Sequence, residues 1–164
     1  MKEIILFYII LLLCACEFQF STKQSHIEDK RLIQQEYKAL IQAVYDKNLQ
    51  HYLSFFDETE YFATDQNGQL LGSLADEKAN FTFNASLIKH NKVIHIRELS
   101  ITMLNASQAI VESYVEMNVL THQSQALTFA GDYRLTYKKK QGRWKITNSS
   151  NNVKPMFNNF LNND

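Results

Sequence analysis

The stretch from Phe129 to Ser149, FAGDYRLTYKKKQGRWKITNS, narrows most strongly the folds open to this chain. Apolar or aromatic residues alternate with small, polar or charged ones as far as Tyr137, and Trp144 and Ile146 resume the apolar series. A period of two is typical of a β-strand that packs one face. Gln141-Gly142 supplies residues suited to the positive φ of a tight turn. The stretch predicts a β-hairpin whose apolar face is covered by the rest of the chain.

Composition sets the class of protein. With 164 residues there is room for one domain. The 17 basic residues equal the 17 acidic ones, so the formal net charge is zero and no basic stripe indicates nucleic-acid binding. Four glycines and one proline leave few chain breaks, which predicts mostly regular structure.

The N-terminus has the pattern of a targeting segment. Lys2 precedes ten apolar residues, 4–13, a run too short to span a bilayer but of signal-peptide length. The sequence Leu13-Cys14-Ala15-Cys16 that follows resembles a bacterial lipobox. The resemblance implies that residues 1–15 are a lipoprotein signal peptide, cleaved before Cys16, whose thiol and new amino group receive fatty acyl chains such as palmitate. The alternative is an ordinary secretory peptide that is cut nearby.

This resemblance also implies a location. Two or three acyl chains anchor a protein stably, because each buried methylene contributes ~0.8 kcal/mol. Glu17, rather than aspartate, follows the lipidated cysteine, which implies the outer membrane, facing the periplasm. Both cysteines of the chain lie in this segment, so a domain without them has no disulfide, cysteine-ligated zinc or cysteine nucleophile.

Residues 16–27 are polar and predict a tether, and the folded domain is expected over residues 28–152. Helical spacing of apolar residues predicts helices near 28–44 and 49–56, and Ser73 with Asp76 predicts the start of a third. Asn67-Gly68 indicates a turn between two short strands. Four long strands are expected at about 92–104, 109–122, 126–139 and 143–149. In the tail, residues 153–164, apolar residues at helical spacing predict a short terminal helix.

This order of elements resembles the NTF2-like superfamily, and its SnoaL-like small domains most closely. The resemblance is carried by LIQAVYDKNLQHYLSFFDE near the start and GDYRLTYKKKQGRWKITNS at the end. It implies an α+β cone, in which a curved antiparallel sheet packs against N-terminal helices and ligands enter the open end. It implies little about activity, because this fold is used by isomerases, dehydratases, cyclases and many non-enzymes.

Turn positions give a strand register and hence a list of candidate site residues. If Leu104 pairs with Ala109 and His122 with Ala126, most apolar side chains of the four strands lie on one face of the sheet. The few polar side chains on that face are the candidate site residues. Glu98 would then lie among Ile96, Val115 and Met117, where desolvation raises the pKa of a carboxyl group as an acid or base requires. The alternative places Glu98 at the sheet edge, solvated or paired with lysine. The predicted ligand-binding residues are Glu98, Ser113, Tyr133, Tyr137, Asn148 and Tyr37.

The same register predicts an apolar patch on the opposite face, formed by Leu99, Ile101, Met103, Ile110 and Tyr114. A patch of this kind usually contacts something. The candidates are a second copy of the chain, a partner protein, and the chain's own tail.

No metal or cofactor is expected. His95 and His122, the histidines of the predicted sheet, lie on opposite faces and ~13 Å apart at ~3.3 Å per residue. No Gly-rich phosphate loop is visible either.

Three functions remain open. We favour a non-catalytic binding module with a small apolar pocket for a small molecule or envelope component. The second is a protein-interaction or immunity-type lipoprotein that binds its partner through the sheet. The third is an isomerase- or dehydratase-like enzyme that uses Glu98 as acid or base with Tyr133 and Tyr137.

Overall fold

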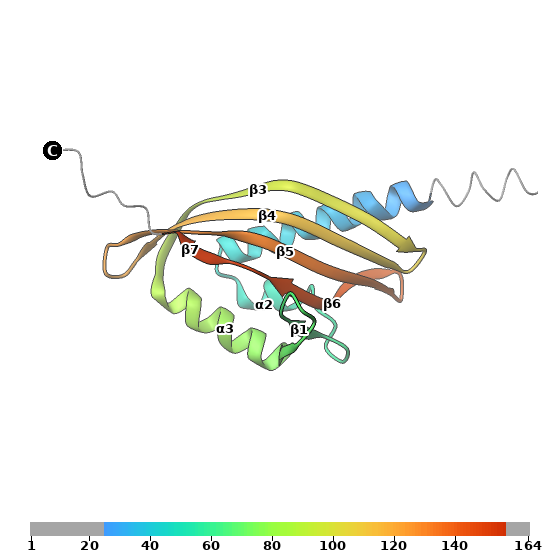
Figure 1. The fold of residues 1–164 in the computed structure, drawn as a ribbon, viewed down its shortest axis with the longest axis horizontal. Helices are drawn as coiled ribbons and strands as arrows, with labels where there is room; N and C mark the ends of the chain where they lie inside the picture. Colours follow the sequence, from blue (N-terminus) through green and yellow to red (C-terminus); the bar gives the residue numbers. More distant parts are fainter. Residues whose placement is uncertain (1–24, 157–164) are drawn as a thin grey trace, which may run out of the picture.

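A computed structural model describes residues 25–156, so the lipobox with Cys16 and the tail residues 157–164 lie outside the described part. One long, curved sheet dominates the molecule, and the helices cover one of its faces (Figure 1). The first helix occupies residues 25–45. The other elements are α2 Leu49–Leu53, β1 Phe62–Thr64, β2 Leu70–Ser73, α3 Leu74–Leu87, β3 Ile88–Asn105, β4 Gln108–Thr121, β5 Ala126–Lys140, β6 Arg143–Asn151 and β7 Lys154–Met156.

The sheet has seven strands in the order β2-β1-β6-β5-β4-β3, and β7 pairs with β5 where β6 has ended. The pairing of β1 with β6 is parallel and the other pairings are antiparallel. The predicted α+β architecture, with N-terminal helices packed on a curved antiparallel sheet, is therefore confirmed. Residues 154–156 are extended, and the short terminal helix expected within residues 153–164 stays a prediction, because residues 157–164 lie outside the described part.

Local sequence explains where the helices lie. Ile33, Tyr37 and Leu40 form the buried stripe of the first helix, as their spacing predicts. The third helix begins with the predicted capping box: the backbone N–H of Ser73 donates to Asp76 Oδ2 at 2.7 Å, and the Ser73 side chain accepts in return from the helix backbone. Helix α3 contains no buried residue, so it flanks the core without filling it.

The last hairpin is built as its sequence predicts. Gln141 and Gly142 have φ angles of 50° and 80°, the left-handed conformation that a two-residue turn requires. Tyr137 lies opposite Ile146, and both side chains are fully buried in the core beside Trp144. The hairpin therefore contributes three buried side chains to the apolar core, close to the Gln141-Gly142 turn.

The register between β4 and β5 differs from the prediction by two residues. Ser113, rather than Val115, lies opposite Tyr133. The cause is the turn, which closes one residue earlier, between Thr121 and Gln125, and places Ser124 in the left-handed region with φ 62°. A shift of two residues keeps every side chain on its predicted face.

A β-bulge in β3 overturns part of the predicted face. The pairing of β3 with β4 is interrupted between Arg97 and Ser100, where Glu98 has a φ of 55°. The extra residue exchanges the two faces beyond it. Glu98 is exposed instead of facing inward, and Ser100 beyond the bulge is exposed as well. The predicted outer patch is also wrong in part, because Leu99, Ile101 and Met103 pack against the core.

A second irregularity, between Thr136 and Tyr137, moves Asn148 from its predicted inner position. Ser149 lies opposite Leu135 instead, and its hydroxyl shares a 2.6 Å hydrogen bond with the Tyr61 hydroxyl. The Asn148 amide turns toward β1, where its Nδ2 donates to the carbonyl oxygen of Phe62 at 3.0 Å. Asn148 therefore joins β6 to β1, and Ser149 takes its place on the inner face.

Candidate functional site

The main cavity lies between the helices and the inner face of the sheet and has a volume of about 490 Å³. The first helix, α2 and α3 form one side, and β3 to β6 form the other. Its apolar wall includes Leu40, Phe56, Phe81, Val115, Met117 and Phe129. Cavities of this size and character are typical of small-molecule sites.

Helix α3 forms one wall of this cavity with a single stripe of residues. Glu77, Phe81 and Ala85 follow one another at intervals of four, and Asn80 and Asn84 lie beside them. Residues three and four apart share one face of a helix. This explains why α3 buries no residue, since its inward face borders a cavity.

Polar groups gather at the end of the cavity where α3 begins. The Glu77 carboxylate accepts a 2.5 Å hydrogen bond from the Tyr52 hydroxyl and a 3.2 Å bond from the Tyr61 hydroxyl. Tyr52 stacks on Phe81, with ring centroids 4.5 Å apart and planes 29° from parallel. Tyr133 also lines the cavity. This end therefore joins one carboxylate to several aromatic rings.

The phenol groups here are held in their neutral form. Burial raises the pKa of Tyr52 well above its ordinary value, and the adjacent Glu77 charge raises it further. Burial also raises the pKa of Tyr61 and of Tyr133. At neutral pH these hydroxyl groups are therefore hydrogen-bond donors and not phenolates.

The opposite end of the cavity carries a different polar set. Lys47 Nζ donates to the carbonyl oxygens of Ile88 and Lys89 at 3.0 and 3.1 Å. Asn91 Nδ2 donates to the carbonyl oxygen of Tyr45 at 2.6 Å, at the end of the first helix. Asn91 Oδ1 is buried and has no partner among residues 25–156.

Only some of the predicted site residues line the inner cavity. Tyr37 and Tyr133 line the cavity, and a ligand contact by either residue stays a prediction. The Tyr37 hydroxyl is hydrogen-bonded to Ser113 Oγ, so these two residues also meet. Tyr137 is 0% exposed within the core and does not reach the cavity. The predicted positions of Glu98 and Asn148 on the inner face are wrong, because the two irregularities of the sheet turn them away.

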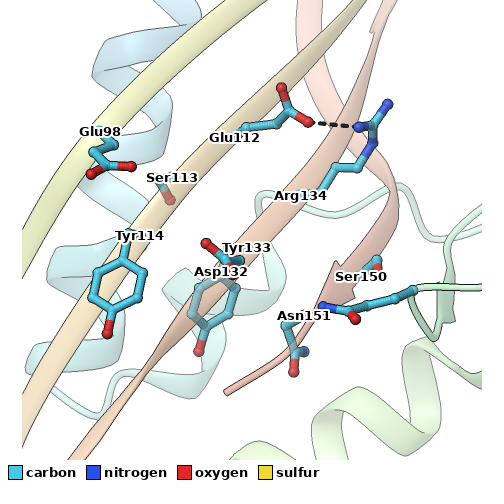
Figure 2. Close-up of a pocket in the computed structure, with 10 residues that line it drawn as sticks. Glu98, Glu112, Ser113, Tyr114, Asp132, Tyr133, Arg134, Ser150 and Asn151 are labelled. Carbon is cyan, nitrogen blue, oxygen red and sulfur yellow. Dashed lines mark hydrogen bonds and ion pairs between the residues drawn. The ribbon is translucent and has the colours of Figure 1, made fainter. Parts of the chain in front are cut away.

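Glu98 borders a second, shallower depression of about 360 Å³ on the outer face of the sheet. An ion pair between Glu112 Oε1 and Arg134 Nη1 crosses β4 and β5 there, with a length of 2.6 Å (Figure 2). Both side chains are about half exposed, so the pair contributes little. The depression is open and its walls are charged, and the inner cavity is the stronger candidate for a ligand site. Glu98 does not line the inner cavity for which its ligand contact was predicted.

Sequence reasoning missed Glu77 and Tyr52, which belong to different helices. A signal existed for Glu77: the capping box fixes where α3 begins, and Glu77 then lies on the same helix face as Phe81.

Between residues 25 and 156, no group of three or more histidine, cysteine, aspartate or glutamate side chains is placed to hold a metal ion. No helix in this described range is long and apolar enough to cross a membrane.

A curved sheet wrapped on helices, with a cavity inside, defines a small α+β cone protein. The family model for the calcium/calmodulin dependent protein kinase II association domain matches residues 29–155, and the chain belongs to this family. A comparison with curated proteins gave no match.

Solved structures share the fold. A putative scytalone dehydratase from Novosphingobium aromaticivorans aligns with a TM-score of 0.71 and 14% identity over 80% of this chain and 88% of the other. A type 2 hexachlorocyclohexane dehydrochlorinase, LinA, gives 0.67 and 13% over 82% and 93%. An NTF-2 like protein of unknown function from Shewanella oneidensis gives 0.59 and 21% over 75% and 98%. These similarities confirm the predicted NTF2-like cone.

Proposed function

We propose that this protein is a lipid-anchored, non-catalytic binding protein of the cell envelope, and that its inner cavity holds a small, mostly apolar molecule. The observation that carries the proposal is the cavity itself. Its volume of about 490 Å³ lies within the range of small-molecule sites. Apolar side chains form its middle and polar groups lie at its two ends, an arrangement that gives affinity through burial and orientation through a few hydrogen bonds.

Filling the cavity tests this proposal. Ala85 lies on the cavity face of α3, so Ala85→Trp places a large ring in the ligand's space. We expect at least tenfold weaker binding of N-phenyl-1-naphthylamine, an apolar probe whose fluorescence rises on burial. Ala79→Trp, at an exposed position on the same helix, is the matched control and should bind as the wild type does. Equal affinity in both variants, or no binding by the wild type, would contradict the proposal.

The lipid anchor needs its own test, because Cys16 lies outside the described residues. The sequence Leu13-Cys14-Ala15-Cys16 after an apolar run supports cleavage and acylation at this cysteine. We expect Cys16→Ala to abolish incorporation of radiolabelled palmitate and to move the protein out of the membrane fraction of a bacterial host. Cys14→Ala should keep both properties. Labelling that persists in Cys16→Ala would show that the anchor lies elsewhere or is absent.

Glu77, together with the Tyr52 and Tyr61 hydroxyl groups that donate to it, favours a second candidate function, that of an enzyme. A carboxylate with two phenol donors inside a cavity can act as a general acid or base. Two of the proteins that share this fold are described as a putative scytalone dehydratase and a hexachlorocyclohexane dehydrochlorinase. Mass spectrometry of a co-purified ligand after incubation with excess protein separates the two functions. A binding protein returns the ligand unchanged, and an enzyme returns a product.

A further inference from the structure

We propose that the inner cavity selects organic cations, and that an amine or quaternary ammonium group sits against Glu77 while the apolar remainder lies along α3. This inference rests on the proposed binding function and names its ligand class. It follows from three observations: the charge at one end of the cavity, the rings around that charge, and the opposite charge at the far end.

The first observation is that Glu77 has no cationic partner within the described range. The acids paired with lysine or arginine there are Glu28, Asp29, Asp57, Glu60, Glu112 and Glu116. Glu77 instead accepts hydrogen bonds from two neutral hydroxyl groups. A carboxylate has about four acceptor positions, so two donors leave part of its capacity unused. Because a charge beside apolar walls is costly without a counter-charge, a ligand cation would offset that cost.

The second observation is the set of rings beside this carboxylate. Tyr52 stacks on Phe81 at 4.5 Å and lies 4.9 Å from the ring of Phe56. Tyr133 lines the same cavity from the sheet side. The faces of aromatic rings carry negative potential and attract ammonium groups, and cages of this kind are known to bind quaternary ammonium ligands. An anionic head group would be repelled here both by the rings and by Glu77.

The third observation fixes the orientation of the ligand. Glu77 lies in the first turn of α3, and Lys47 bonds to the carbonyl oxygen of Ile88, just beyond its last turn. The ten residue-to-residue steps from Glu77 to Leu87 rise about 15 Å along the helix axis. A cation is therefore drawn to the Glu77 end and repelled from the Lys47 end, and its chain lies along the apolar wall between them.

Three ligands with the same alkyl chain test this inference by isothermal titration calorimetry: octyltrimethylammonium, octanol and octyl sulfate. We expect the wild type to bind the ammonium compound at least tenfold more tightly than octanol, and octyl sulfate the most weakly. Glu77→Gln, which keeps an acceptor for Tyr52, should weaken ammonium binding about tenfold and leave octanol binding unchanged. Glu58→Gln, at an exposed position, should bind all three as the wild type does.

Two results would overturn the inference. One is equal ammonium affinity in Glu77→Gln and the wild type. The other is a preference for octyl sulfate that is lost in Lys47→Gln, which would assign an anion site to the far end. In either case, retained binding of N-phenyl-1-naphthylamine would leave the proposed binding function standing. If Glu77→Gln fails to fold, the order of the three ligands on the wild type decides the question.

Discussion

Replacing Trp144 with alanine is expected to lower the free energy of unfolding by about 3–5 kcal/mol, the usual cost of removing a large aromatic side chain from a core. Trp144 is 3% exposed and belongs to the main hydrophobic cluster. Its Nε1 donates to Asp29 Oδ1 at 3.2 Å, and Lys139 Nζ lies 5.6 Å from the ring centroid. The alanine variant therefore loses apolar contacts, a hydrogen bond and a cation–π contact together.

Urea unfolding followed by far-ultraviolet circular dichroism measures this loss, because Trp144 is the single tryptophan of the chain and its fluorescence disappears in the variant. Trp144→Phe is the control. Phenylalanine keeps much of the ring packing but has no N–H group, so it should cost less than alanine. A loss below about 1 kcal/mol for alanine would contradict the burial of this side chain, since surface substitutions have effects of that size or smaller.

The last hairpin could be predicted because its information is local. Alternation of apolar residues indicates the packed face, and Gln141-Gly142 indicates the turn, so the pairing of Tyr137 with Ile146 follows directly. The same holds for α3, whose first residue is set by a capping box between Ser73 and Asp76. These elements depend on residues that are near one another in the sequence.

The bulge in β3 could not be predicted in this way. Glu98 adopts a φ of 55° without being glycine, asparagine or aspartate, so no residue type marks the position. The apolar series Leu99, Ile101 and Met103 did carry the signal, because it continues the alternation of Ile94 and Ile96 with one residue inserted. The prediction of an outer patch from this series is wrong, because the bulge turns the three side chains toward the core.

The candidate site was harder to predict than the fold, because its parts meet only in three dimensions. Tyr52 on α2 and Glu77 on α3 are 25 residues apart and bond across two helices. The alternation of side chains along a strand places Tyr133 on the inner face of the sheet, but it does not tell which helical residues lie opposite Tyr133. Tyr137 shows the same limit. The alternation places its side chain on the inner face of the sheet, and only the packing in the structure shows that it lies in the core and does not line the cavity.

Asp29 is the second residue whose loss should have a large effect, because it joins the first helix to the last hairpin. Lys139 Nζ on β5 lies 2.7 Å from Asp29 Oδ1, which also accepts from Trp144 Nε1 on β6. Asp29→Ala leaves a buried indole N–H without an acceptor and Lys139 without its partner. We expect a loss of about 2–3 kcal/mol in the free energy of unfolding, measured in urea.

Two further variants separate the contributions at Asp29. Asp29→Asn keeps an acceptor for the indole and should cost less than alanine. Glu28→Ala removes an adjacent acid whose pair with Arg31 is half exposed, and should change stability by no more than about 0.5 kcal/mol. Because Asp29 and Trp144 share a hydrogen bond, the double alanine variant should lose less than the sum of the single losses. Additive losses, or a stable Asp29→Ala, would show that the helix is held to the hairpin by packing alone.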